Sequence, residues 1–269
     1  MPTLPVNGIH LYYEVSGQGP PLLFIHGLGS SARDWELQVA PFSDQFQVIT
    51  FDVRGHGQSD KPPGPYSIPL FATDTAELIR TLGIATASTR GGAPVHVVGI
   101  SMGGMIAFQL AVSYPDLIRS MVIVNSSPEM ILHTFRERLQ AFQRLLILRL
   151  FGMRKMAELL SKRLFPKPEQ ADLRQMLVER WAENDVRAYS DAARGLLGWS
   201  VVDRLGTIEC PTLVIAADHD YTPVALKEAY VAKMPQAELV VIQDSRHATP
   251  VEQPERFNQV LAAFLSKQT

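Results

Sequence analysis

The chain has 269 residues, of which 46% are hydrophobic and 19% charged, so its composition predicts a folded protein with a sizeable core and excludes a disordered one. The formal net charge of −2 offers no electrostatic reason to expect nucleic acid or an anionic membrane as a partner. Cys210 is the single cysteine, so no internal disulfide can form, and we interpret it as a small core residue. We find neither a signal-peptide pattern nor an apolar run long enough for a membrane span, and we expect a cytoplasmic protein.

Strand and helix patterns alternate along the chain. Ile9, Leu11, Tyr13 and Val15 recur at the two-residue period of a half-buried strand. Short apolar runs follow, typical of parallel strands covered on both faces: Pro21–Gly27, Phe46–Asp52, Val95–Ser101, Ser120–Ser126, Thr212–Asp218 and Ala237–Asp244. Helical patterns lie between them: Arg33–Phe42, Pro69–Leu82, Met102–Ser113, Pro223–Lys233 and Pro254–Ser266. The alternation predicts an α/β fold with a doubly wound, mostly parallel sheet and right-handed crossovers.

One segment interrupts the alternation. From about Pro128 to Leu205 no convincing strand pattern occurs, while His133–Met153 is strongly helical and two or three further helical patterns follow. We therefore predict an α/β core formed by residues 1–127 and 206–269, with a helical insertion at 128–205. The apolar residues of the first inserted helix are expected to form its packing face, a smaller share of them lining an acyl pocket: Phe135, Leu139, Phe142, Leu145, Leu146, Leu148 and Met153.

Ser101 stands between Gly99 and Gly103, on a very short turn between a core strand and an apolar helix. A serine hydroxyl becomes a good nucleophile only when it is exposed and a base takes its proton. The two glycines let the turn form without Cβ clashes, and the start of the helix directs free N–H groups at the same place. The pattern predicts Ser101 as a nucleophile and the Met102 N–H as an oxyanion donor. The alternative is a packing turn with an incidental serine.

The activating base should lie on another loop at the same edge of the sheet. Among the seven histidines, His247 is the best placed, because it follows the last strand and precedes the final helix. The loop after the preceding strand offers Asp218 and Asp220 as the orienting carboxylate. We prefer Asp220, since Asp218 follows the strand closely and could cap local backbone; Asp218 stays an alternative and Asp244 a weaker one. Asn125 ends another strand, but an amide cannot stabilise an imidazolium by charge.

A second oxyanion donor is expected from the glycine-rich turn after the Pro21–Gly27 run. We choose the N–H of Leu28, with His26 holding the turn through its ring nitrogens. Three further side chains are weak candidates for a substrate pocket, and we favour core or surface packing for each of them: Trp35, Met105 and Trp199.

Together these residues resemble the α/β-hydrolase superfamily over nearly the whole chain. The matching signals are Gly99-x-Ser101-x-Gly103, His26-Gly27, the segment Asp52–Ser59, the aspartate-containing loop before Pro223, and His247. The resemblance implies Ser101 as nucleophile, Asp220 as acid and His247 as base. It also implies a helical cap over the active site at about 128–205 and a structural turn at Asp52–Ser59.

This sequence departs from the superfamily pattern in three places. Ala217 stands where many relatives have glycine before the acid, and Arg246 stands where glycine often precedes the histidine. The spacing from the acid to Pro223 is one residue shorter than in many relatives, which is a further reason to keep Asp218 open.

Within the superfamily, Gly99–Ala111 is similar to the nucleophile segment of 3-oxoadipate enol-lactonases and small carboxylesterases. We therefore expect a serine hydrolase that cleaves a small-molecule ester or lactone without metal or cofactor. Carbon–carbon hydrolases often carry Asn before the serine and Trp after the histidine, where this chain has Ile100 and Ala248. A serine also argues against dehalogenases and epoxide hydrolases, which use aspartate. A carbon–carbon hydrolase, a cofactor-free perhydrolase and a non-catalytic small-molecule-binding protein remain alternatives, and the oligomeric state is not readable.

Overall fold

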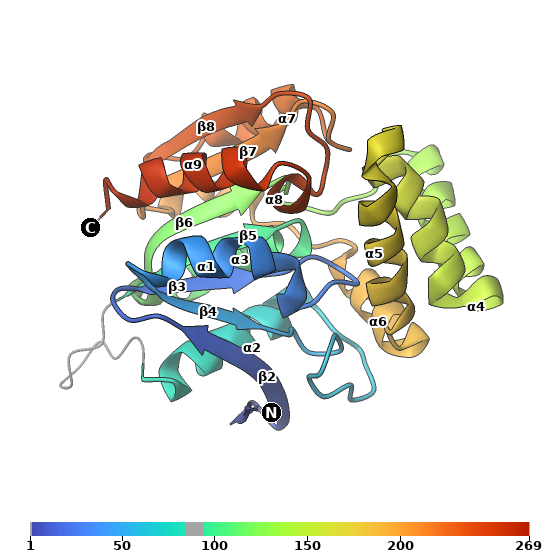
Figure 1. Ribbon diagram of the computed structural model, residues 1–269, viewed down its shortest axis with the longest axis horizontal. Helices are drawn as coiled ribbons and strands as arrows, with labels where there is room; N and C mark the ends of the chain where they lie inside the picture. The colour runs from blue at the N-terminus through green and yellow to red at the C-terminus, as the bar shows by residue number, and fades with distance from the viewer. Residues whose placement is uncertain (1, 84–93, 269) are drawn as a thin grey trace.

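A computed structural model describes residues 2–83 and 94–268 (Figure 1). Within these residues the strands form one eight-stranded sheet in the order β1-β2-β4-β3-β5-β6-β7-β8. The strands are β1 Thr3–Val6, β2 Ile9–Ser16, β3 Pro21–Ile25, β4 Gln47–Phe51, β5 Val95–Ile100, β6 Ile118–Val124, β7 Thr212–Ala217 and β8 Ala237–Ile242. The pairings from β4 through β8 are parallel, whereas β1 pairs antiparallel with β2, and β2 pairs antiparallel with β4. The predicted mostly parallel sheet is confirmed, while the short edge strand β1 was not predicted.

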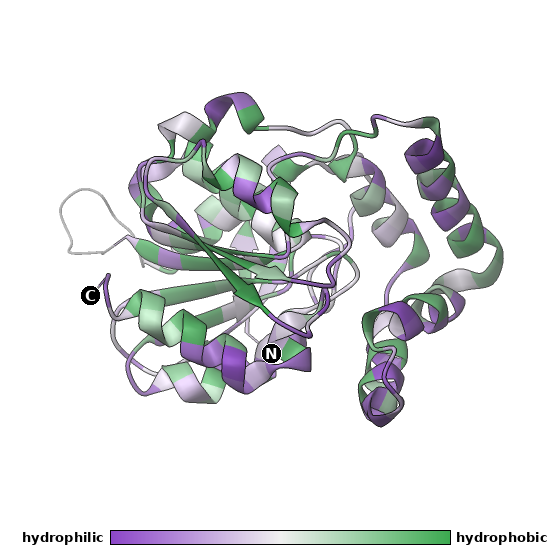
Figure 2. Ribbon diagram, turned by 90° about the horizontal axis from the view of Figure 1, so that it is seen from above, coloured by the Kyte–Doolittle hydropathy of each residue, from purple (hydrophilic) through white to green (hydrophobic). Residues whose placement is uncertain are grey.

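Helices cover both faces of the sheet. They are α1 Glu36–Ser43, α2 Ile68–Thr81, α3 Met102–Ser113, α4 Phe135–Leu164, α5 Ala171–Ala182, α6 Val186–Leu196, α7 Val224–Val231, α8 Thr249–Glu252 and α9 Pro254–Leu265. Alternate residues of one strand enter different cores: Leu23 belongs to the cluster that includes α2, α3 and α7, whereas Phe24 belongs to the cluster under α1 and α9. Figure 2 shows the hydrophobic strands at the centre of the molecule. Burial of both sheet faces explains the nearly continuous apolar runs in the sequence.

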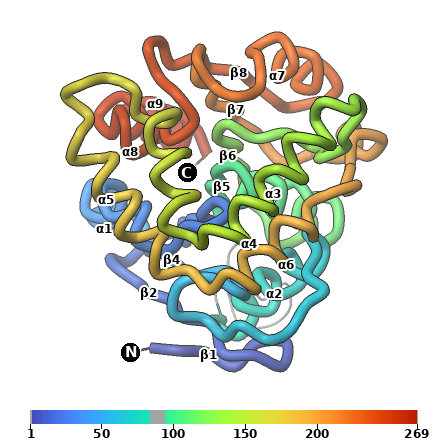
Figure 3. The backbone as a smooth tube through the Cα atoms, turned by 90° about the vertical axis from the view of Figure 1, so that its right-hand side faces the viewer, coloured from blue at the N-terminus to red at the C-terminus, as the bar shows by residue number. Residues whose placement is uncertain are grey.

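The segment between β6 and β7 is helical, as predicted, and its helices α4, α5 and α6 stand together beyond the carboxyl ends of the central strands (Figures 1 and 3). They have a core of their own, in which Leu148, Trp181 and Tyr189 are buried. None of the described helices combines the length and the apolarity that a bilayer span requires. We refer below to α4–α6 as the cap helices.

We predicted that the apolar residues of the first inserted helix form its packing face, and this prediction is wrong for most of them. Phe135 is 81% exposed and Phe142 62% exposed, and Leu139 and Leu146 are also exposed. Leu148 and Met153 are buried as expected. The difference arises because α4 contacts α5 and α6 with one side only, and a hydrophobic pattern reports the apolar faces of a helix without reporting which of them meets a partner.

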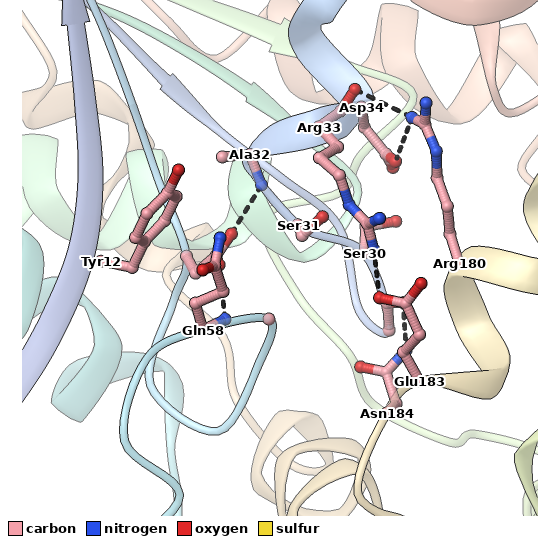
Figure 4. Close-up of a pocket in the computed structure, with 13 residues that line it drawn as sticks. Tyr12, Ser30, Ser31, Ala32, Arg33, Asp34, Gln58, Arg180, Glu183 and Asn184 are labelled. Carbon is pink, nitrogen blue, oxygen red and sulfur yellow. Dashed lines mark hydrogen bonds and ion pairs between the residues drawn. The ribbon is translucent and has the colours of Figure 1, made fainter. Parts of the chain in front are cut away.

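A polar junction fastens the cap helices to the sheet domain. Arg180 of α5 donates to the carbonyl of Arg33 at 2.9 Å and pairs with Glu36 at 2.6 Å, and Arg33 pairs with Glu183. Arg33, Arg180 and Glu183 border a cavity of about 180 Å³, shown in Figure 4. Ser101, Asp220 and His247 do not line this cavity. We therefore interpret these polar contacts as the attachment of the cap helices to the sheet and not as part of the candidate active site.

Candidate active site

Ser101 occupies a strained position between β5 and α3. Its φ of 54° and ψ of −117° lie in a region that non-glycine residues rarely adopt. The flanking glycines are required by sterics: a Cβ on Gly99 would lie 2.2 Å from the Gly103 oxygen, and one on Gly103 would lie 2.1 Å from the Ile25 oxygen. The Ser101 N–H donates to the Val124 carbonyl at 3.0 Å. The turn therefore holds the serine at the carboxyl end of the central strand.

Asp220 and His247 meet at the same edge of the sheet. The Nδ1 atom of His247 donates to Asp220 Oδ1 at 2.6 Å; the aspartate side chain is 1% exposed and the histidine 19% exposed. Burial alone raises the pKa of the Asp220 carboxyl. The hydrogen bond and charge of His247 and the ammonium of Lys227 outweigh burial and hold that pKa well below its usual range. Asp220 is therefore a carboxylate at neutral pH.

The second oxygen of Asp220 is held by two residues that the sequence analysis missed. Lys227 Nζ donates to Oδ2 at 2.7 Å, and Thr222 Oγ1 donates to it at 2.8 Å. The ammonium also donates to the Thr222 carbonyl at 2.9 Å and to Thr222 Oγ1 at 2.7 Å, which accounts for all three of its N–H groups. A signal existed: Lys227 lies three residues before the buried Tyr230, on the inner face of α7.

Asp218 and Asp244 have other partners. The Asp218 carboxylate accepts the backbone N–H groups of Asp244 and Ser245, both at 3.0 Å. The Asp244 side chain pairs with Lys167 at 2.5 Å. Of the three aspartates considered from the sequence, the structure brings only Asp220 against His247. Asp218 instead ties the loop after β8 to the end of β7.

Asn125 is a further residue whose structural role the sequence did not reveal. Its Nδ2 group donates to the carbonyls of Arg246 and His247, at 3.1 and 2.9 Å, and to Thr249 Oγ1 at 2.8 Å. Its Oδ1 accepts the N–H of Ala217 at 2.8 Å. Its φ of 43° is left-handed, a conformation in which asparagine is enriched. Asn125 thus joins the end of the acid's strand to the loop that carries the histidine.

The neighbouring residue connects this network to the serine turn. Ser126 Oγ donates to the carbonyl of Ser101 at 2.7 Å. The side-chain oxygen of Ser101 has no hydrogen-bond partner among the described residues, so the structure holds no Ser101–His247 hydrogen bond. Catalytic contacts are often loose in a protein without substrate.

The backbone N–H groups of Leu28 and Met102 are available for an oxyanion. Within the described part of the chain neither donates to another residue. The turn after β3 lies directly against the serine, since a Cβ on Gly27 would stand 3.5 Å from the Ser101 Cβ. Met102 is the first residue of α3, where N–H groups lack intrahelical partners and the helix dipole is positive.

His26 holds that turn, as the sequence indicated. Its Nδ1 donates to the Gly27 carbonyl at 2.7 Å, and its Nε2 accepts the N–H of Val53 at 2.9 Å. Burial lowers the pKa of His26 to about 4, so the ring is neutral at pH 7. The following segment is also structural, because Arg54 forms a buried ion pair with Asp74, with its Nε 2.6 Å from Oδ2.

Tyr221 covers the catalytic histidine candidate and reaches toward the cap. Its ring lies 4.5 Å from the His247 ring, centroid to centroid, with an interplanar angle of 30°. The guanidinium of Arg163, on α4, lies 5.2 Å from the centre of the Tyr221 ring. These contacts make a continuous stack from the cap helices to His247, which no local sequence pattern indicated.

The three pocket candidates have packing partners in the structure. Trp35 is 1% exposed, and its ring lies 4.7 Å from that of Phe24 in the core under α1 and α9. Trp199 donates its indole N–H to Gln109 Oε1 at 2.7 Å. Met105, on α3, is 4% exposed within the other core cluster. We therefore interpret all three as packing residues.

Comparisons with known proteins agree with this fold. A family model described as the alpha/beta hydrolase family matches residues 22–260, and the chain belongs to that family. The chain is 30% identical to 3-oxoadipate enol-lactonase 2 of Acinetobacter baylyi, over 98% of this chain and 96% of the relative. It is 31% identical to (E)-2-((N-methylformamido)methylene)succinate hydrolase of the same species, over 96% and 95%. The enol-lactonase structure from Burkholderia xenovorans LB400 superposes with a TM-score of 0.89 at 26% identity, covering 98% of this chain and 100% of that one.

The family resemblance stated from the sequence motifs is therefore confirmed. The relatives named above are hydrolases, and this protein is a hydrolase of the same family. The similarity extends over the cap helices as well as the sheet, because both relatives and the solved structure are covered almost end to end.

Proposed function

We propose that this protein hydrolyses a carboxylic ester or lactone of a small molecule through an acyl-enzyme, with Ser101 as nucleophile, His247 as base and Asp220 as acid. The carrying observation is the pairing of His247 Nδ1 with the buried Asp220 carboxylate at 2.6 Å, at the same edge of the sheet as a serine held at φ 54° on a strand-to-helix turn. These three roles follow the chain order of nucleophile-elbow enzymes. The enol-lactonase relatives, whose names specify a lactone substrate, support this reaction class.

In the first half-reaction, His247 Nε2 takes the proton of Ser101 as Oγ attacks the carbonyl carbon. The resulting oxyanion accepts the N–H groups of Leu28 and Met102, which need no reorganisation because the backbone already fixes them. Asp220 holds the Nδ1–H tautomer and stabilises the imidazolium. His247 then protonates the alkoxide oxygen as the C–O bond breaks, leaving an acyl ester on Ser101.

In the second half-reaction, water replaces the alcohol as the nucleophile. His247 removes a proton from the water as it attacks the acyl carbon, and the same backbone donors accept the second oxyanion. Collapse of that intermediate breaks the bond to Ser101, and His247 returns the proton to Oγ. For a lactone, the alcohol and the acid are two ends of one product.

The test is hydrolysis of p-nitrophenyl esters from acetate to decanoate and of an enol-lactone, by the wild type, Ser101→Ala and the control Ser43→Ala. Ser43 ends α1, and its hydroxyl donates to the Ala40 carbonyl. We expect kcat to fall by about 10⁴-fold or more in Ser101→Ala and to remain unchanged in the control. Wild-type turnover in Ser101→Ala refutes the proposal.

Three further measurements separate the alternatives. A p-nitrophenyl phosphate triester should add a stable phosphoryl mass to the wild type and not to Ser101→Ala, which identifies the nucleophile independently of the natural substrate. Peroxide-dependent halogenation exceeding ester hydrolysis would identify a perhydrolase. Saturable ligand binding without turnover of any ester or lactone would identify a binding protein.

A further inference from the structure

The outer face of the first half of α4 is an unusual apolar surface. Five residues spaced by four, three, four and four positions fall on one side of a helix with 3.6 residues per turn. They are exposed by 81%, 41%, 62%, 41% and 63%: Phe135, Leu139, Phe142, Leu146 and Leu150. We call these five residues the α4 stripe. Single exposed apolar residues are common on proteins, but an aligned row of this kind marks an interaction surface.

The α4 stripe points away from the cap's own core. Leu148, which the helical period places on the opposite side, is fully buried in the cluster with Trp181 and Tyr189. Arg144, also on that inner side, donates to the Tyr189 hydroxyl. Figures 1 and 3 show α4 as the outermost element at the cap end of the molecule. The stripe is therefore neither part of the cap's core nor part of the site around His247.

The same element, which consists of two helical segments joined by a kink at Gly152, concentrates positive charge. Between Phe135 and Leu164 there are eight basic residues and two acidic ones, in a chain whose totals are 25 and 27. The basic residues are Arg136, Arg138, Arg144, Arg149, Arg154, Lys155, Lys162 and Arg163. Among the described residues, only Lys155 of these eight forms an ion pair, with Glu158 at 2.9 Å. The overall charge of −2 thus conceals a local excess of six positive charges.

Arginines border the α4 stripe directly. Arg138 follows Phe135 by three positions, Arg149 follows Leu146 by three, and Arg136 precedes Leu139 by three. Residues three apart are neighbours on a helix surface, so these guanidinium groups flank the apolar row. Phenylalanine and leucine on one face with arginine beside them is the composition of helices that lie in the plane of a membrane interface.

We propose that the α4 stripe docks this protein on an anionic lipid surface. The Phe and Leu side chains would enter the boundary between headgroups and acyl chains, and the flanking arginines would bind lipid phosphates. This is attachment parallel to the membrane, consistent with the finding that no described helix is apolar enough to cross one.

The positive charge of α4 favours an anionic lipid surface over a second copy of the chain as the partner of the α4 stripe. Two copies meeting through their stripes would bring together two Phe135–Phe151 segments, each with four basic residues and one acidic residue, and like charges at an interface oppose association. The phosphates of a nucleic acid would pair with the arginines, but a nucleic acid offers no apolar layer for Phe135 and Phe142, the two exposed rings of the α4 stripe. Anionic lipid satisfies both the charge and the apolar surface.

The test is flotation of the full-length protein with vesicles of phosphatidylcholine alone and of equimolar phosphatidylcholine and phosphatidylglycerol, at low and high salt. We expect binding to the anionic vesicles, little binding to the neutral ones, and weakening at high salt. Phe142→Ser with Leu146→Ser, and Arg138→Glu with Arg149→Glu, should each reduce binding by about tenfold or more. Leu226→Ser on α7, 58% exposed, is the matched control and should bind like the wild type.

Thermal unfolding and hydrolysis of a soluble ester check that the variants are folded. Absence of wild-type binding to anionic vesicles, or equal binding by both double variants, overturns the proposal. So does a wild-type dimer in sedimentation velocity that Phe142→Ser with Leu146→Ser converts to monomer, since the stripe would then be covered by a second copy. Ser101→Ala should float with the anionic vesicles like the wild type, although it has no turnover. The test of lipid binding is therefore independent of the proposed hydrolase function.

Discussion

Lys227 Nζ lies 2.7 Å from Asp220 Oδ2, and each of the two side chains is 1% exposed, so the acid of the proposed triad is half of a buried ion pair. The other oxygen of the same carboxylate holds His247. Removing one partner of a buried pair leaves an uncompensated charge away from water, which is much more unfavourable than removing both. The lysine is therefore a positioning residue for the carboxylate, and its effects on stability and on catalysis can be measured separately.

The first prediction concerns stability. Lys227→Met should lower the free energy of unfolding by about 3–5 kcal/mol, because the Asp220 carboxylate loses its cation in a buried place. The double variant Lys227→Met with Asp220→Asn should regain part of that loss, since no buried charge remains. Urea unfolding measures both, with the exposed Lys233→Met as control. A double variant less stable than Lys227→Met would contradict the explanation.

The second prediction concerns the pH profile of Lys227→Met. The ammonium partly neutralises the carboxylate that would stabilise the imidazolium, so its removal should favour the protonated form of His247, the proposed base. The acidic limb of kcat/KM against pH should therefore move to higher pH than in the wild type, whereas a purely structural role would lower kcat/KM evenly across the range. An unmoved limb would assign Lys227 to stability alone.

The third prediction separates the two neighbouring aspartates. Asp220→Asn should lower kcat by about 10⁴-fold, because an amide neither fixes the histidine tautomer nor stabilises its cation. Asp218→Asn should retain most of kcat and lose stability, since Asp218 accepts the N–H groups of Asp244 and Ser245 rather than binding the histidine. Steady-state kinetics and urea unfolding of the pair decide between them; the reverse ranking of kcat would make Asp218 the acid.

The fourth prediction tests the Asn125 network. Asn125→Asp keeps the size and the tolerance of a left-handed φ, but it places a carboxylate against the carbonyls of Arg246 and His247 in place of a donor. We expect the free energy of unfolding to fall by about 1–3 kcal/mol and kcat to fall with it, because the histidine loop loses its anchor. Comparison with Asn125→Ala isolates the repulsion. An aspartate variant more stable than the alanine one would contradict the repulsion, and an alanine variant as stable as the wild type would show that the donors are unimportant.

The fifth prediction is a loss of stability in mild acid. Burial lowers the pKa of His26 and His96 to about 4 and that of His56 to about 3. The unfolded chain, with histidine pKa values near 6.5, binds more protons in this range, so stability is complete above about pH 6.5 and falls as the pH approaches 4. Each histidine with a pKa of about 4 contributes about 3 kcal/mol to that fall.

The His96→Leu variant tests this assignment away from the proposed active site. Its free energy of unfolding should depend less steeply on pH between 6.5 and 4 than that of the wild type. The exposed His133→Leu variant should keep the wild-type slope. Parallel slopes for His96→Leu and the wild type would mean that other groups produce the acid sensitivity.

Much of the fold and part of the site could be predicted from sequence because they depend on neighbours along the chain. Apolar runs identified the parallel strands, since both faces of the sheet are buried. The glycines around Ser101 indicated a turn that a Cβ would block at either side. Parallel strands end at a common edge, so the loops that carry Asp220 and His247 were expected to converge there.

Other features were decided only by tertiary structure. Asp218 and Asp220 differ by two positions, and their partners lie in a loop some 27 residues away, so local pattern left the choice open. The part played by Lys227 depends on the burial of α7, and that of Asn125 on the meeting of two strand ends with the histidine loop. The sequence showed that the first inserted helix carries an apolar stripe, but only the packing of Leu148 into the cap determined which apolar side remains exposed. Periodicity records a helix's faces; contacts between distant segments determine which of those faces water still reaches.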